Sequence, residues 1–194
     1  LTQKITFQLI KIKLIKNLEY SLAHACGLML ICLAIGSISY AQESTNRVDA
    51  KTDWSVFIED QPTKECWVVS KPTKEVTTRD GQNVKVKRSD ILLFVTYQPA
   101  NGINGQVSFT GGYKIDPKKS VELNIDGVKF SLVVDNEHAW LPNDAEDKKA
   151  IEALKRGSTA IVSAQSLRSG TLTKDTFSLS GFTAAIAEAE KRCG

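Results

Sequence analysis

Apolar and polar residues alternate through much of the chain after residue 53, with the two-residue period of half-buried β-strands. In the first such stretch, Trp54, Val56 and Ile58 alternate with Ser55, Phe57 and Glu59. Similar stretches predict strands at 54–59, 66–69, 91–97, 106–115, 121–125, 128–134, 159–167 and 170–180. Asp126-Gly127 lies between two of them and is the strongest hairpin signal in the chain.

Residues 71–89 form a polar segment with Asp80-Gly81 at its middle, which predicts a projecting hairpin. Val84 and Val86 alternate there with Lys85 and Lys87, and Arg88 follows. The three basic residues are a candidate partner surface. The pattern favours a solvated strand edge, because lysines commonly protect exposed edges from pairing with another chain.

Two stretches have the helical period instead. In the first, Asn143 or Asp144 can cap the start, Gly157 ends the helix, and the apolar stripe is Ala150, Ile151 and Leu154. In the second, Ser180 is the expected N-cap, and the apolar face is Phe182, Ile186, Ala189 and Cys193. The chain is therefore predicted to be mainly β, an antiparallel β-sandwich or open barrel with one internal helix and one C-terminal helix.

The first 41 residues have the layout of a secretory signal peptide. Four lysines and one acid precede an apolar run from Leu22 to Ile38, and Ser39-Tyr40-Ala41 offers small residues at the two positions that a signal peptidase reads. A retained membrane anchor is the alternative, since the run is just long enough to span a bilayer. We expect a signal peptide at 1–41, a flexible lead-in at 42–52 and a single β-rich domain at 53–194.

Cleavage at this site changes the charge and the cysteine count. The whole chain has 25 basic and 22 acidic residues, and residues 42–194 have 21 of each. The net charge of +3 thus belongs to the leader, so the domain gives no reason to expect nucleic acid as a partner, and a membrane is expected only through an uncleaved leader. Cys66 and Cys193 are the two cysteines that remain, and in an exported protein they favour a disulfide over two free thiols.

Few residues are available for catalysis or for binding a metal. His138 is the one histidine after the leader, so a catalytic triad would have to use it, and its neighbours Trp140 and Leu141 favour a structural position. No cofactor motif or metal-ligand spacing is present, so no cofactor and no metal are expected. Trp54, Trp67 and Trp140 could line a sugar or ligand groove, although packing in the core or at an interface is favoured.

The ends of the domain resemble a known family. Asp53-Trp54, the following Cys66, the run Leu179-Ser180-Gly181-Phe182-Thr183-Ala184-Ala185 and the terminal Cys193 are similar to the invasion-associated locus B proteins of alphaproteobacteria. The resemblance covers roughly residues 53–193, and Gly181 and Phe182 belong to its most specific part. It implies a periplasmic, envelope-associated or secreted β-rich domain with a disulfide joining its two ends. It implies no catalytic residues.

Three hypotheses for function follow. The first is a non-enzymatic exported protein that binds an unknown protein or envelope partner, or supports the envelope, and is linked to host-cell invasion or persistence. The second is an envelope enzyme that acts on cell-wall or host polymers through carboxylates that only the fold brings together. The third is a host-facing adhesin that reaches the cell surface.

Overall fold

Twelve antiparallel strands form one continuous sheet, ordered β1-β2-β3-β6-β7-β10-β9-β8-β11-β12-β4-β5, in the computed structural model of the protein. The structure describes residues 46–194, which lie in one compact unit, Ser44–Gly194. The predicted leader lies outside the described residues. The edges β1 and β5 do not pair with each other, so the sheet stays open. The prediction of a mainly β, antiparallel fold with two helices is confirmed.

The elements have the following bounds. The strands are β1 (Arg47–Lys51), β2 (Trp54–Glu59), β3 (Glu65–Ser70), β4 (Lys74–Arg79), β5 (Gln82–Asn83), β6 (Leu92–Gln98), β7 (Ile103–Thr110), β8 (Val121–Ile125), β9 (Val128–Asp135), β10 (His138–Trp140), β11 (Thr159–Gln165) and β12 (Leu172–Ser178). The α-helices are α2 (Asp144–Arg156) and α3 (Phe182–Cys193), and a short 3-10 helix, η1 (Pro99–Asn101), precedes β7.

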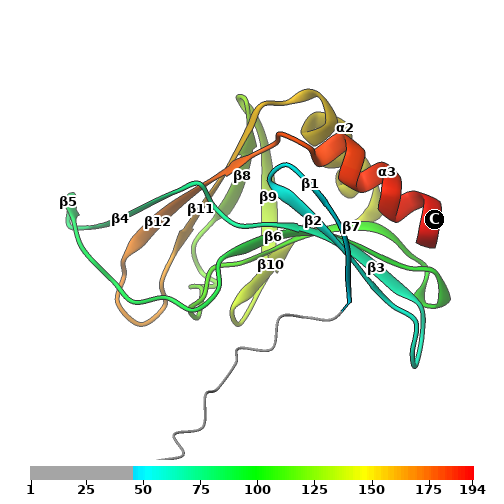
Figure 1. The fold of residues 1–194 in the computed structure, drawn as a ribbon. Helices are drawn as coiled ribbons and strands as arrows, with labels where there is room; N and C mark the ends of the chain where they lie inside the picture. The colour runs from blue at the N-terminus through cyan, green and yellow to red at the C-terminus, as the bar shows by residue number, and fades with distance from the viewer. Residues whose placement is uncertain (1–45) are drawn as a thin grey trace, which may run out of the picture. The chain divides into compact units, whose positions relative to one another are not determined.

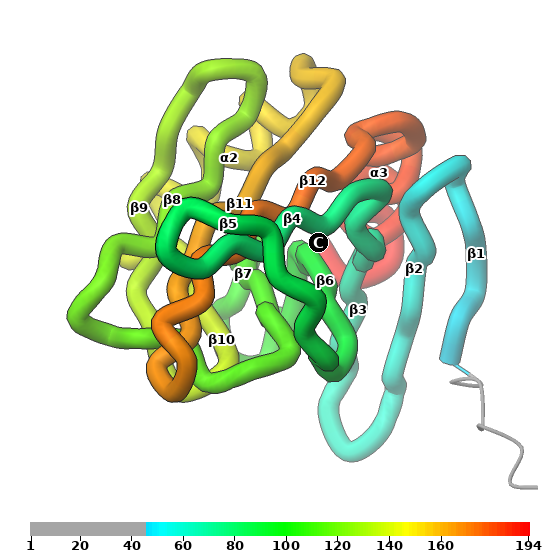
Figure 2. The backbone as a smooth tube through the Cα atoms, turned by 90° about the vertical axis from the view of Figure 1, so that its left-hand side faces the viewer, coloured from blue at the N-terminus to red at the C-terminus, as the bar shows by residue number. Residues whose placement is uncertain are grey.

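The sheet folds over at β9, so that its two halves face each other across the core. One half contains β1, β2, β3, β6, β7 and β10, and the other contains β8, β11, β12, β4 and β5. Figure 2 shows β1 and β2 at one side of the domain and β8 and β9 at the other. Phe109 of β7 meets Phe177 of β12 edge to face, with ring centroids 6.3 Å apart. This contact joins the inward faces of the two halves.

The two α-helices lie side by side at one end of the folded sheet (Figure 1). Helix α3 packs on β1, β2, β3 and β6, and α2 packs on β7 and β9. The N-cap of α2 is Asn143, whose side chain accepts hydrogen bonds from the backbone N–H groups of Ala145 and Glu146, and Gly157 is its C-cap. These ends of α2 agree with the prediction, because they depend on local residue types.

The hairpin between β8 and β9 also agrees with the prediction. Asp126 and Gly127 both have positive φ, at 46° and 99°, which is the backbone of the tight turns that connect neighbouring antiparallel strands. Gly112 is also required to be glycine, because a Cβ on it would lie 2.6 Å from the carbonyl oxygen of Ser89. The two backbones approach closely here, and only glycine leaves room for this contact.

Three local expectations are wrong. Residues Arg47–Lys51 form strand β1 instead of a flexible lead-in, because their backbone pairs with β2 although their side chains are largely exposed. The 71–89 hairpin exists, but its second strand is Gln82–Asn83 and does not continue through Val84 and Val86. The N-cap of α3 is Gly181, with no side-chain cap bond, so Ser180 does not have the expected role.

Candidate functional site

The two ends of the domain meet at α3. Gly181 has φ +90°, and a Cβ on it would lie 1.9 Å from the carbonyl oxygen of Lys51 in β1. Phe182 follows and packs edge to face on Trp54, with ring centroids 4.8 Å apart. The Trp54 indole N–H donates a hydrogen bond of 3.0 Å to the carbonyl of Ser178. Trp54, Gly181 and Phe182 are therefore parts of a structural junction, and Trp54 lines no groove.

A disulfide closes the same junction. The Sγ atoms of Cys66 in β3 and Cys193 in α3 are 2.07 Å apart, and their Cα atoms are 5.9 Å apart. Both side chains are buried in the core. This is the pairing that the sequence favours, and it anchors the last turn of α3 to the sheet.

Arg88 is not part of a basic surface. Its side chain is 5% exposed, and its two terminal nitrogens donate to the two carboxylate oxygens of Asp175, at 2.7 and 2.6 Å. Its Nε donates to the carbonyl of Gly111, and its guanidinium lies 5.1 Å from the centre of the Tyr113 ring. Lys85 and Lys87 are exposed, so the expected group of three is divided. Arg88 lies between β5 and β6 and is buried against Asp175 of β12, so each of the two buried charges has a partner of opposite sign.

Two carboxylates are buried in the described part of the chain, and they lie on different elements with different partners. Asp175 of β12 is completely buried and paired with Arg88. Asp147 of α2 accepts a 2.8 Å hydrogen bond from the backbone N–H of Val107. Burial raises the pKa of Asp147 to about 6, the Val107 bond opposes the shift, and the charge of Asp144 adds to it. Because each acid is engaged separately, they do not form a pair for acid–base chemistry.

The remaining candidates for chemistry are dispersed. His138 is exposed on β10, beside Thr110 of β7 and Asp135 of β9 in the strand register. Between residues 46 and 194, no three His, Cys, Asp or Glu side chains gather in a way that could hold a metal ion. Over the same residues, no helix is long and apolar enough to cross a membrane.

The outward side of the first half of the sheet carries a group of apolar side chains that we call the aromatic face. Its members are Phe57, Trp67, Val69, Phe94, Trp140 and Val133. None of the six belongs to the buried core cluster; Val133 is exposed, and the other five are half-buried. The rings of Phe57 and Trp67 stack 5.4 Å apart with planes 3° apart. Solvent-facing strand positions are usually polar, so this is an unusual outer surface.

The strand register explains how these residues come to share one face. Val69 pairs with Phe94, Phe94 with Ser108, Ser108 with Trp140, and Trp140 with Val133, so the row crosses five strands. A parallel row contains Phe57 and Trp67, followed by Thr96 and Gln106. In these two rows, Ser108, Thr96 and Gln106 carry hydroxyl or amide groups, and Arg47 of β1, opposite Phe57, carries a positive charge.

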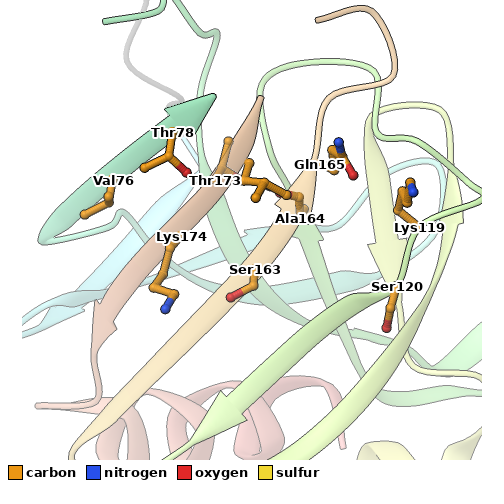
Figure 3. Close-up of a pocket in the computed structure, with 10 residues that line it drawn as sticks. Val76, Thr78, Lys119, Ser120, Ser163, Ala164, Gln165, Thr173 and Lys174 are labelled. Atoms are coloured by element: carbon orange, nitrogen blue, oxygen red, sulfur yellow. The ribbon is translucent and has the colours of Figure 1, made fainter. Parts of the chain in front are cut away.

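A groove crosses the outward side of the other half of the sheet, over β4, β12 and β11 and the start of β8. Its volume is about 450 Å³. Figure 3 shows Val76 and Thr78 on β4, Lys174 on β12, Ser163 and Gln165 on β11, and Lys119 and Ser120 before β8. Leu172 also lines the groove and is 53% exposed.

The family model for the invasion associated locus B (IalB) protein matches residues 54–190. The chain belongs to the IalB family. The match begins at Trp54 and extends into α3, so it includes the junction around Gly181 and the whole sheet from β2 to β12. It also includes the aromatic face and the groove.

A solved structure has the same fold. It is described as the crystal structure of invasion associated protein B from Bartonella henselae, with 16% identity and a TM-score of 0.50. The comparison covers 73% of this chain and 94% of that chain. A comparison with curated proteins found no match.

The three tryptophans, considered together as possible groove residues from the sequence, lie in different places in the structure. Trp54 is in the core, whereas Trp67 and Trp140 lie on the aromatic face. Phe57 and Phe94 were not singled out from the sequence. A signal for both exists: the positions that alternate with the core residues include Phe57 in the first strand, and Leu92 and Phe94 in the strand at 92–97. Two apolar faces on one strand indicate a second surface to be covered.

Proposed function

We propose that this IalB family protein is an exported, non-enzymatic protein of the cell envelope that binds a partner protein through the aromatic face. The aromatic face is the observation that carries this proposal. Contiguous apolar patches on a protein surface mark interaction sites, and aromatic residues are enriched at the centre of protein interfaces. Since Arg47, opposite Phe57, is the one charged residue in the described rows that contain the face, the complementary partner has a mainly apolar surface.

Two further observations support the proposed location. IalB family proteins are exported, and a disulfide such as Cys66–Cys193 persists in oxidising compartments. The signal peptide at 1–41 would direct the chain to the periplasm, where the domain supports the envelope or is passed on to the surface. The name of the Bartonella henselae protein connects the fold with invasion, and we propose that partner binding contributes to host-cell invasion or persistence.

Mass spectrometry of the protein purified from cells tests the location. We expect a chain that begins after Ala41 and that gains two hydrogens on reduction. A full chain with four free thiols in envelope fractions would contradict both the cleavage and the disulfide.

Site-specific photo-crosslinking in intact cells tests partner binding. A photo-reactive residue at Phe94 should give one discrete adduct. The same residue at Leu167, a 55% exposed apolar position outside the face, serves as the matched control. Trp67→Ser with Trp140→Ser should abolish the Phe94 adduct and reduce host-cell entry without changing the amount of folded protein.

Two outcomes would contradict the proposal. Equal adducts at Phe94 and Leu167 would mean that the aromatic face has no specific partner. An adduct of twice the chain mass would mean that a second copy of the chain, and not a different protein, covers it.

A further inference from the structure

The groove on β4, β12 and β11 is lined by side chains that are repeated across neighbouring strands. In the register, Ser163 lies opposite Lys174, which lies opposite Val76. In the next outward row, Gln165 lies opposite Leu172, which lies opposite Thr78. Two rows of this kind form a strip across the strands, with Ser120 at one end and β4 at the other (Figure 3).

The charges in the groove have one sign. Lys119 and Lys174 are both exposed, and neither forms an ion pair with the described residues. No acidic residue lines the groove. Among the described residues, two acids lie beside the groove. Glu122 of β8 is opposite Ser163, with its carboxylate 3.2 Å from Lys129, and the carboxylate of Asp116 accepts a hydrogen bond from the backbone N–H of Lys118. The groove is therefore complementary to a negatively charged ligand.

The shape of the groove favours an elongated ligand. It extends over four neighbouring strands, which are roughly 14 Å across at 4.8 Å per strand. Its hydroxyl and amide groups, on Thr78, Ser120, Ser163 and Gln165, can pair with peptide N–H and C=O groups. Val76 and Leu172 provide an apolar contact for a side chain of the ligand.

We propose that this groove binds an extended acidic peptide segment of another protein. Lys119 precedes β8, and Lys174 lies on β12, two strands away and level with Glu122 in the register. Two strand spacings and an offset of three residues along the strands place their Cα positions roughly 14 Å apart. An extended peptide spans roughly 13 Å in four residues, with side chains i and i+4 on the same side. Two glutamates four residues apart, with an apolar residue between them, therefore fit both lysines and Leu172. Because the groove and the aromatic face share no residue, the two proposals are independent.

Fluorescence anisotropy with the full chain tests this site. The probe is a fluorescein-labelled peptide, Glu-Ser-Leu-Ser-Glu, and the control peptide replaces both glutamates with glutamine. We expect saturable binding of the acidic peptide and at least about fivefold weaker binding of the control. Raising the salt concentration should weaken the binding of the acidic peptide, because the charges are exposed to solvent.

Variants of the groove locate the binding. Lys119→Gln and Lys174→Gln should each weaken binding about two- to fivefold, and the double variant about tenfold. Ser163→Trp should abolish binding by filling the groove while leaving its charge unchanged. Lys148→Gln, an exposed lysine of α2 that does not line the groove, is the matched control and should have no effect.

Three results would overturn the proposal. The first is equal binding of the acidic and glutamine peptides. The second is an acidic-peptide affinity that is the same in the double lysine variant and in Lys148→Gln. The third is competition by phosphatidylglycerol vesicles that bind the groove more tightly than the peptide, which would assign the groove to a membrane surface.

Discussion

Substitution of Gly181 by alanine tests whether the junction between the two ends of the domain is as tight as the structure indicates. Gly181 begins α3 with φ +90°, and its missing Cβ would lie 1.9 Å from the carbonyl oxygen of Lys51 and 2.6 Å from the carbonyl carbon. Real Cβ contacts essentially never fall below 3.0 Å, so the backbone of β1 or α3 must move by about an ångström. Flexible side chains cannot relieve this clash, because Lys51 meets it with its backbone.

The expected effect has two parts. A non-glycine residue in the left-handed region costs about 1–2 kcal/mol. Displacing the backbone also weakens the hydrogen bond from the Asp53 N–H to the Ser180 carbonyl and the packing of Phe182 on Trp54, which adds about 2–3 kcal/mol. We expect Gly181→Ala to lower the free energy of unfolding by about 3–5 kcal/mol, a large part of the roughly 5–15 kcal/mol of a typical domain.

Urea unfolding followed by tryptophan fluorescence measures this difference. Gly102→Ala is the matched control, because Gly102 has φ +71° but has nothing within 4 Å of its Cβ position. Gly102→Ala should lower the free energy of unfolding only by the cost of the left-handed backbone, about 1–2 kcal/mol. Ser180→Ala should change stability by less than about 0.5 kcal/mol, since Ser180 does not cap α3. If Gly181→Ala and Gly102→Ala lost the same free energy, the clash with Lys51 would not exist in the folded protein.

Three other predictions concern the buried polar groups and the disulfide. Arg88→Met should cost about 3–5 kcal/mol because it leaves the carboxylate of Asp175 buried without a partner, and adding Asp175→Leu should recover most of the loss; additive losses would refute this pairing. Folding raises the pKa of Asp147 from 3.8 to about 6, so protonation of this carboxyl stabilises the folded protein. This stabilisation is complete below about pH 4 and is lost as the pH rises through 6. Asp147→Asn should flatten that part of the stability–pH curve, by up to about 3 kcal/mol, and an unchanged curve would place its pKa elsewhere. Reduction of Cys66–Cys193 should cost up to about 5 kcal/mol because the bridge separates residues by 127 positions, whereas the double alanine variant should not respond to reductant.

Much of the fold follows from local patterns in the sequence. The alternation in 121–125 and 128–134, with Asp126-Gly127 between them, predicts β8, β9 and the turn that joins them. The ends of α2 are predicted equally well by Asn143 and Gly157. The expectations that failed depend on distant partners. Arg47–Lys51 is short and mostly charged, with Val48 and Ala50 as its apolar residues, and it becomes a strand because its backbone pairs with β2.

The candidate sites depend even more on tertiary structure. Trp67 and Trp140 are far apart in the chain, and they share the aromatic face only because β6 and β7 lie between β3 and β10. The groove likewise combines residues from β4, β11 and β12, whose order in the sheet does not follow the order in the chain. No local pattern contains this information.

The sequence by itself therefore determined the β-rich class, the hairpin at Asp126-Gly127, the ends of the internal helix and the resemblance to the family. These depend on residue types within a few positions of each other, where backbone sterics and hydrogen bonding decide the structure. Only the tertiary structure decided that Arg88 is buried against Asp175, that the basic group around it is divided, and that aromatic side chains gather outside the core. Those outcomes depend on which strands become neighbours, and that is set by burial of the whole core rather than by any one segment.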